Sequence, residues 1–398
     1  MKIKRQDITW APHIPLIGGF PLGAEKSLGK PPEEIISLDG FWTNDRQYVN
    51  YMNEVKKNDI KYTTLDPEDF SFKKKINMII STCPCAALSS LNTGKNKNVR
   101  GCQALQNGYI YVTTEQAIKC YDADVIVGEN APGLYTAKGL NVANKIHGIA
   151  RENGYSMTLF KTNTIFHGLP QNRIRTFYIL WKNDKAPAMN WVREDYTEFK
   201  DYLAQVTRDM PDQNTIINRR IGQSESYYNF IKHKTGKNPR DILITDGRVT
   251  AMKWIAVNDL FEEARDWFIE TGDAKGADLA SHAIYKHSIG KGVWDSSTHV
   301  FDKAMNAVIG RNLADTIHPT EDRSLTVREA FHMMGFPHDF ELIGNKGAFN
   351  LIAQNVPVNT AATIIDEATK FLTGEMDEFT PYHYLRQDNI KQTTIGVE

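Results

Sequence analysis

The sequence lacks a disulfide framework, a long apolar run and an excess of charge of either sign. Its 398 residues include only four cysteines, too few for a disulfide framework in a chain of this length, so a reducing, intracellular environment is expected. No run of 18 apolar residues is available to span a membrane, and the polar residues 1–5 are not followed by a signal-peptide core. The net charge of −1 excludes bulk attraction to nucleic acid, so such binding requires a local basic surface.

The residues that are present suffice for a sizeable core. Hydrophobic residues make up 41% of the chain and aromatic residues 10%, so disorder is not expected, and the length suggests two or three domains. Short runs rich in Ile and Val, at residues 34–38, 76–80, 125–127 and 176–181, predict strands buried on both faces. Segments with helical spacing, such as residues 136–154, separate them. The sequence therefore predicts an α/β fold with a mostly parallel sheet flanked by helices, whose ligands bind beyond the carboxyl ends of the strands.

The character of the sequence changes after Trp181, which divides the chain into three parts. Residues 1–182 carry the predicted strands, residues 183–317 are more polar, irregular and rich in glycine, and residues 318–398 return to the α/β pattern. The last strong helix is expected over residues 359–372. We interpret the middle part as an inserted second domain.

The middle part contains one clear helix and one basic segment. The helix is expected over residues 259–271, with Asn258 as its N-cap and Gly272 as its end. Residues 216–253 hold eight basic residues against three acidic ones, with aromatic residues interleaved. The interleaved aromatic residues are Tyr227, Tyr228 and Phe230. This segment is interpreted either as a solvated charged face or as a surface that contacts nucleic acid.

A cysteine motif follows the second predicted strand. In Cys83-Pro84-Cys85, a thiol placed in a strand-to-loop turn near backbone N–H groups has the surroundings that a nucleophile needs. A simply packed cysteine is the alternative interpretation, and Cys83 competes with Cys85 for the role of nucleophile. A metal site is not favoured, because no His or second cysteine pair stands at ligand spacing.

Two further loops carry charged side chains beside predicted strands. Glu129 follows the strand at residues 125–127, where a carboxylate lies at the functional edge of the sheet and can have a raised pKa. Arg173 and Arg175 precede the strand at 176–181, and their spacing places both on one face, which suits phosphate or base contacts. Arginine pairs of this kind also occur as ordinary surface charges.

In combination, these motifs resemble the cytosine-5 DNA methyltransferase family. Pro84-Cys85, Glu129-Asn130 and Gln171-x-Arg173-x-Arg175 occur in the family's order, and motifs at residues 323–329 and 335–337 follow them. Residues 17–25 resemble the family's cofactor-binding motif, residues 98–101 the end of its mobile catalytic loop, and residues 353–357 its last motif, which packs near the first. The resemblance covers about residues 12–182 and 318–373, and it implies that residues 183–317 form a target-recognition domain.

The resemblance implies a base-flipping enzyme that transfers a methyl group from S-adenosylmethionine, or a close analogue, to carbon 5 of cytosine in double-stranded DNA. Cys85 would attack carbon 6 of the flipped cytosine. Glu129 would hold or protonate ring N3, and Asn130 would orient the Glu129 loop. Arg173 would contact the base, and Arg175 would support the loop or the backbone.

The remaining implied site residues bind the cofactor or the DNA. Asp39 would bind the cofactor ribose, and Asp59 would lie near the adenine, with Asp66 as the alternative. The residues implied in cofactor binding are Gly18, Gly19, Phe20, Asp39, Phe41, Asp59, Pro84 and Asn355. The residues implied in DNA binding are Ser89, Arg100, Gln171, Arg219, Arg220, Lys232 and Lys234. No metal is implied, and a cytoplasmic monomer from a bacterium or phage, acting in DNA modification, is expected.

The first motif departs from the family pattern. Ile14 and Leu16 stand where the family has an aromatic residue and its first glycine, whereas the nucleophile, the acid and the arginines are intact. Methyl transfer is the main expectation. Three alternatives stay open: another one-carbon or substituted-methyl donor, an RNA substrate such as tRNA, or a DNA-binding protein without turnover.

Overall fold

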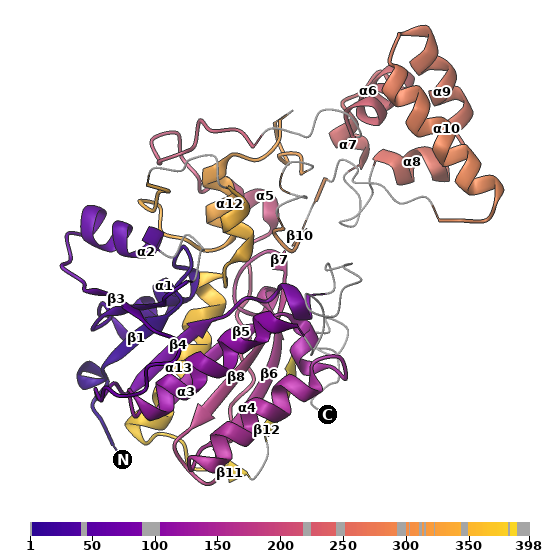
Figure 1. The fold of residues 1–398 in the computed structure, drawn as a ribbon. Coiled ribbons are helices and arrows are strands. Elements are labelled where there is room, and N and C mark those ends of the chain that lie inside the picture. Colours follow the sequence, from indigo (N-terminus) through magenta and orange to yellow (C-terminus); the bar gives the residue numbers. More distant parts are fainter. Residues whose placement is uncertain are drawn as a thin grey trace, which may run out of the picture. The chain divides into compact units, whose positions relative to one another are not determined.

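The structure is a computed structural model of two compact units (Figure 1). It describes residues 2–40, 46–89, 104–217, 224–243, 251–292, 300–301, 303–309, 313, 316–321, 323–343, 349–380 and 383–387. The first unit comprises Met1–Tyr196, Met334–Asn345 and Gln354–Glu398, and the second comprises Thr197–Met333 and Lys346–Ala353. The domain limits expected after residues 182 and 317 stay a prediction. Among the helices of the described residues, none is long and apolar enough to cross a membrane.

The first unit is built on an eight-stranded sheet with the strand order β12-β6-β8-β5-β4-β1-β2-β3. Only β8 runs antiparallel to its neighbours, β5 and β6, and the other pairs are parallel. The strands are β1 (Trp10–His13), β2 (Ile35–Leu38), β3 (Tyr62–Leu65), β4 (Met78–Thr82), β5 (Val125–Asn130), β6 (Ser156–Asn163), β8 (Ile174–Trp181) and β12 (His383–Gln387). This confirms the predicted α/β fold with a mostly parallel sheet, and the four predicted apolar runs form β2, β4, β5 and β8.

Helices cover both faces of this sheet (Figure 1). On one face, α3 (Gly108–Lys119) and α4 (Leu140–Glu152) pack with their apolar sides on the strands. On the other face, α1 (Gly19–Leu28) and α13 (Val358–Thr373) lie together. A Cβ added at Gly23 would lie 2.3 Å from the Cβ of Ala361, so only glycine permits this close contact between α1 and α13.

The last helix forms as the sequence predicts. Helix α13 ends at Gly374, whose φ of 75° is the left-handed conformation that glycine adopts at helix ends. Because α13 packs on α1, a helix late in the sequence completes the apolar core of the first unit beside its first helix.

The remaining elements of the first unit are short. They are η1 (Arg5–Asp7), α2 (Arg46–Asn50), η2 (Tyr51–Val55), η3 (Ala86–Leu88), η6 (Leu105–Asn107), η7 (Pro132–Tyr135), η8 (Thr164–Phe166), β7 (Gln171–Asn172), β9 (Ala186–Pro187) and β11 (Phe379–Thr380). Strands β9 and β11 pair antiparallel. The short helices η3 and η7 matter for function, because they directly follow β4 and β5.

The second unit contains more helix than the sequence analysis expected. Its elements are α5 (Phe199–Leu203), α6 (Ser224–Thr235), α7 (Pro239–Leu243), α8 (Ala251–Val257), α9 (Phe261–Glu270), α10 (Ala274–Ser288), β10 (Met305–Asn306) and α12 (Val327–Met333), and η9 (Phe349–Gln354) begins in it. Helices α6 to α10 share an apolar core. The aromatic residues Tyr227, Tyr228 and Phe230 are buried in that core, so they mark the inner face of α6 and are not exposed for base stacking.

The cap expected for the 259–271 helix is wrong. Helix α9 begins at Phe261, with Leu260 at the N-cap position. The side chain of Asn258 instead donates to the carbonyl of Trp254 within α8 (2.7 Å). Asp259 has a φ of 55°, so the chain turns between α8 and α9 at the residues where the sequence suggested a helix start.

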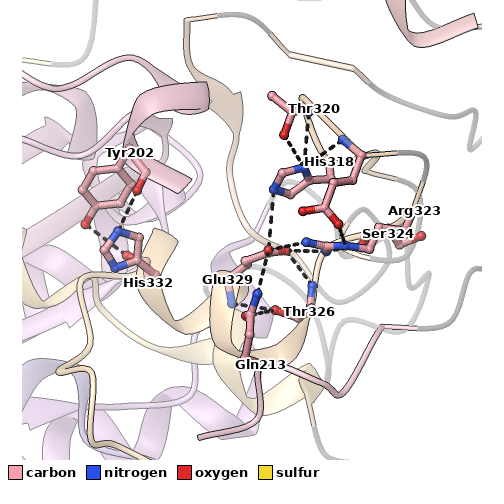
Figure 2. A network of polar contacts seen from close by, with 10 residues as sticks. Tyr202, Gln213, His318, Thr320, Arg323, Ser324, Thr326, Glu329 and His332 are labelled. Carbon is pink, nitrogen blue, oxygen red and sulfur yellow. Dashed lines mark hydrogen bonds and ion pairs between the residues drawn. The ribbon is translucent and has the colours of Figure 1, made fainter. Parts of the chain in front are cut away.

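A buried carboxylate, Glu329, ties three segments of the second unit together (Figure 2). Thr326 and Glu329 form a capping box at the start of α12: the Thr326 N–H donates to Glu329 Oε2 (2.9 Å), and the Glu329 N–H donates to Thr326 Oγ1 (3.1 Å). Arg323 donates to both carboxylate oxygens, at 2.8 and 2.7 Å. Gln213 also donates to Oε1 (3.4 Å), and His318 Nε2 lies 3.6 Å from it.

Hydrogen bonds keep the side chain of Glu329 ionised. Burial alone would raise its pKa, but the bonds from Arg323 and the Thr326 N–H outweigh burial and hold the pKa below its ordinary value. His318 Nδ1 accepts from the backbone N–H groups of Thr320 (3.2 Å) and Glu321 (3.1 Å). The neutral ring therefore carries its proton on Nε2, toward Glu329.

We predict that Glu329→Gln destabilises the protein by about 3 kcal/mol, because it leaves Arg323 without its buried partner. The contribution of Glu329 is fully present above its unfolded pKa of about 4.3 and is lost as pH falls through the lower folded pKa. Urea denaturation at neutral pH measures the change. Glu321→Gln, which removes an exposed partner of Arg323, is the control and should cost less than about 1 kcal/mol. Equal losses in both variants would contradict the account.

Candidate active site

The predicted reactive residues gather at one edge of the sheet. Strands β5, β4, β1, β2 and β3 are neighbours and parallel, so the loops that follow them share the carboxyl edge. Cys85 follows β4, Glu129 lies near the end of β5, and Asp39 follows β2. The loop from Ile14 to Gly18 joins β1 to α1 at the same edge.

The loops after β4 and β5 are fastened to each other. Asn130 donates from Nδ2 to the carbonyl of Pro84 (3.5 Å), and its Oδ1 accepts from the N–H of Ala131 (2.9 Å). A Cβ at Gly133 would lie 2.1 Å from the carbonyl oxygen of Leu88, so glycine is required where η7 meets η3. These contacts hold the loop of Cys85 in a fixed relation to the loop of Glu129.

Glu129 and Arg175 form a buried ion pair. Glu129 is 2% exposed, and Arg175 Nε lies 2.9 Å from its Oε1. Burial raises the pKa of Glu129, and the charges of Arg175 and Arg173 oppose the rise without cancelling it. This carboxyl group is thereby suited to hold a proton or release one.

Cys85 is half-buried beside this pair. Burial, and then the charge of Glu129, raise the pKa of its thiol, while Arg175 and Arg173 work in the opposite direction. The thiol of the free protein is therefore protonated at neutral pH, and attack by sulfur requires removal of that proton.

Cys83 belongs to the core. It is 3% exposed, and its Sγ lies 3.3 Å from both Ser81 Oγ and Thr113 Oγ1. Burial raises the pKa of this thiol to about 11 despite those contacts. The geometry favours Cys85 as the nucleophile. The anchoring role of Ser81 and Thr113 had no signal in the sequence.

The structure gives the two arginines different partners. Arg175, expected to support the backbone, pairs with Glu129. Arg173, expected to contact the base, is 1% exposed and donates from Nη2 to the carbonyl oxygen of Asn355 (2.8 Å). Arg173 thus bonds to a backbone carbonyl and Arg175 is paired with the acid, and which of them contacts the base stays a prediction.

Two residues implied in cofactor binding are enclosed by the protein. The ring of Phe20 packs edge-to-face on Phe177 in the core, with 5.9 Å between centroids, so its side chain does not face a ligand. Asn355 is buried, and its Oδ1 accepts from the N–H of Gly19 (3.1 Å). The space beside Gly18 is filled by Tyr48, whose ring lies 2.8 Å from an added Cβ.

The acidic residues at this edge require one correction. Asp39 follows β2 and is exposed, and its Oδ1 accepts from the N–H of Gly40 (3.1 Å). Asp59 precedes β3, at the opposite edge of the sheet, whereas Asp66 directly follows β3. Asp66 is thus the acidic residue near Asp39. Phe41 lies outside the described residues.

The residues implied in DNA binding are only partly placed. Gln171 is fully buried, and its Nε2 lies 3.6 Å from Met334 Sδ, so its side chain does not reach a ligand surface. The carbonyl of Ser89 accepts from Lys138 Nζ (3.3 Å), a lysine beside the site that the sequence analysis missed. On α6, Lys232 is exposed and Lys234 pairs with Glu263. The residues of this group outside the described part of the chain are Arg100, Arg219 and Arg220.

The loop from β1 to α1 is strained. Ile14 and Leu16 have φ values of 59° and 53°, in the left-handed region that side chains with a Cβ rarely adopt. Leu16 is half-buried and packs against the same apolar core as Cys85. The loop therefore keeps a glycine-like backbone at Leu16 while carrying a large side chain there.

The fold, a mostly parallel sheet with a half-buried cysteine after β4 and a buried acid in β5, is shared with solved methyltransferases. Solved structures with a similar fold include a DNA modification methyltransferase encoded within a prophage (E. coli), which is 17% identical, covers 92% of this chain and 99% of its own, and has a TM-score of 0.55. The Entamoeba histolytica methyltransferase EhMeth is 13% identical, with coverages of 93% and 99% and a TM-score of 0.51.

The family is C-5 cytosine-specific DNA methylase, whose model matches residues 17–370, and the chain belongs to it. A relative from Oceanobacillus iheyensis, named as a type II methyltransferase (M.OihORF3336P), is 22% identical and the match covers 90% of this chain and 92% of the relative. The resemblance recognised in the sequence is confirmed, and the chain is a cytosine methyltransferase.

A protein is usually more stable with alanine than with glycine at a given position. We predict the opposite at residue 16. Both Leu16→Gly and Leu16→Ala lose the packing of the side chain, but only glycine removes the strain of the left-handed backbone. Leu16→Gly should therefore be more stable than Leu16→Ala by about 1 kcal/mol. Thermal and urea denaturation of the two variants measure the difference. An alanine variant as stable as the glycine variant would show that the loop is not strained at this residue.

Proposed function

We propose that this chain transfers a methyl group from S-adenosylmethionine to carbon 5 of a cytosine in DNA, through a covalent bond between Cys85 and a base flipped out of the duplex. The observation that carries the proposal is the half-buried thiol of Cys85 beside the buried Glu129–Arg175 pair. Family membership supports the cytosine substrate.

A covalent intermediate overcomes the low reactivity of cytosine carbon 5. Carbon 5 of cytosine is a poor nucleophile, and addition of a thiolate to carbon 6 gives the ring the electron density that carbon 5 needs. Both faces of the ring are stacked in a duplex, so the base must leave the helix before sulfur can reach it.

The proton path uses Cys85 and Glu129. The thiol proton passes to Glu129 and from it to ring N3, while Sγ bonds to carbon 6 and the electrons of the 5,6 double bond become available at carbon 5. After carbon 5 has accepted the methyl group, its proton leaves to water, the Sγ–C6 bond breaks, and the N3 proton returns through Glu129 to sulfur. Arg175 keeps Glu129 oriented throughout.

The carboxyl edge fits S-adenosylmethionine at its nucleoside end. Asp39 and Asp66 follow neighbouring parallel strands and are exposed there, so their carboxylates are available to the ribose hydroxyls and the adenine. The loop from β1 to α1, which carries Leu16, lies at the same edge of the sheet. The cofactor, when bound, supplies an electrophilic methyl group.

Duplex DNA is the proposed partner. The names of the relatives support it, since they describe a type II methyltransferase and a DNA modification methyltransferase of a prophage. The chain has nearly equal numbers of acidic and basic residues, so we expect DNA to be held by a local basic surface and not by net charge. A role in a restriction–modification system agrees with these names.

Nucleoside mass spectrometry tests the proposal. Duplex DNA incubated with the protein and S-adenosylmethionine should gain 5-methylcytosine. Cys85→Ser should abolish it, whereas Cys83→Ser should retain most of it, because Cys83 packs in the core. Methylation of another base, or activity that depends on Cys83 and not on Cys85, would contradict the proposal.

We predict that Glu129→Gln slows methyl transfer much more than it weakens DNA binding. A positioned acid or base contributes about 10²- to 10⁴-fold in rate, and glutamine cannot carry the proton between sulfur and N3. Single-turnover kinetics and DNA titration measure the two effects separately. If DNA affinity falls while the single-turnover rate is unchanged, Glu129 is a binding residue and not the proton carrier.

A further inference from the structure

Asn355 contacts both halves of the active site. It lies just before α13 and is 2% exposed. Its side-chain Oδ1 accepts from the N–H of Gly19, the first residue of α1 after the strained loop (3.1 Å). Its main-chain oxygen accepts from Nη2 of Arg173 (2.8 Å). One residue thus bonds to the loop on the cofactor side and to an arginine on the catalytic side.

The backbone at Gly19 and the backbone of the Asn355 segment are packed too closely to move independently. A Cβ at Gly19 would lie 2.1 Å from the carbonyl oxygen of Val356 and 3.0 Å from the Cβ of Asn355. Helix α13 begins two residues after Val356 and is packed closely on α1 at Gly23. A shift of the Gly19 backbone must therefore move the Asn355 segment as well, because packed backbones transmit displacement.

Arg173, the second hydrogen-bond partner of Asn355, acts on the reacting groups. Arg173 directly precedes β8 and stands two residues before Arg175, the partner of Glu129. The charge of Arg173 lowers the pKa of both Glu129 and Cys85, against the larger effect of burial. The position of Arg173 therefore affects the pKa of the Cys85 thiol, although the Arg173 guanidinium is bonded to Asn355.

We infer that Asn355 is a positioning residue that couples the cofactor loop to the catalytic cysteine, through Gly19 on one side and Arg173 on the other. The inference rests on the proposed function for the identity of the cofactor. Ligand bound at the loop and the charge around Cys85 are then linked, and the linkage is reciprocal: a change at either end alters the other.

Two measurements on the full-length protein test the coupling. Calorimetry gives the affinity for S-adenosylhomocysteine. Alkylation by iodoacetamide as a function of pH, read at the Cys85 peptide by mass spectrometry, gives the apparent pKa of that thiol in surroundings that include Glu129, Arg175 and Arg173. Asn355→Ala should weaken S-adenosylhomocysteine binding by about 3- to 10-fold, the loss of one neutral hydrogen bond, and should raise the pH at which Cys85 reacts.

Asn359→Ala is the matched control, because Asn359 also lies at the α1–α13 contact, where it accepts from Lys26, whereas the Gly19 N–H donates to Asn355. It should change neither measurement. Arg173→Lys tests the opposite direction and should weaken S-adenosylhomocysteine binding even if Asn355→Ala does not fold.

The outcomes are distinct. If Asn355→Ala or Arg173→Lys changes one measurement and leaves the other at the value of the unaltered protein, the coupling is wrong. If Asn359→Ala reproduces both effects, they arise from general loosening of the helix contact, and the coupling is again wrong. If the unaltered protein does not bind S-adenosylhomocysteine at all, the proposed cofactor fails and the inference fails with it.

Discussion

The buried carboxylate of Glu129 is the constraint around which the first unit is organised. A charge removed from water costs several kcal/mol unless it is paired and hydrogen-bonded. The partner is Arg175, and it reaches Glu129 because β8 runs antiparallel beside β5, with Asn130 opposite Thr176. The parallel neighbour β4 brings Cys85 to the same edge. Among the described strands of this sheet, the antiparallel β8 thus supplies the counter-charge, and the parallel β4 leads to the proposed nucleophile.

The return of the chain to the first unit completes this arrangement. Helix α13 lies with α1 on one face of the sheet, and Asn355, just before α13, accepts hydrogen bonds from Gly19 and Arg173. The inserted second unit therefore separates two parts of the chain that need each other for a closed core. The framework of the second unit comprises one apolar cluster among α6 to α10 and the polar cluster around Glu329.

The features that depend on a local sequence pattern could be predicted from the sequence. Apolar runs located β2, β4, β5 and β8, and the motif spacing located Cys85 and Glu129. The roles of Arg173 and Arg175 could not be assigned, because residues two apart on a strand share a face and only their partners distinguish them. Asp59 and Asp66 could not be separated without the position of β3.

Other errors arose where burial was not visible in the sequence. Phe20 follows two glycines, as a ligand-contacting residue would, but its ring is held by Phe177. The aromatic residues of α6 suggested a surface for bases, yet they face the core of a helical cluster. At Asn258, a side-chain bond to the preceding helix competes with capping of the next one.

The most direct test of the central claim is a crystal structure of the protein trapped on duplex DNA that carries 5-fluorocytosine at its target, since fluorine at carbon 5 prevents release of the cysteine. The account predicts a bond from Cys85 Sγ to carbon 6 of an extrahelical cytosine, Glu129 at ring N3 with Arg175 still paired to it, and Arg173 still bonded to Asn355. A base that stays stacked in the duplex, or a bond to another cysteine, would contradict it.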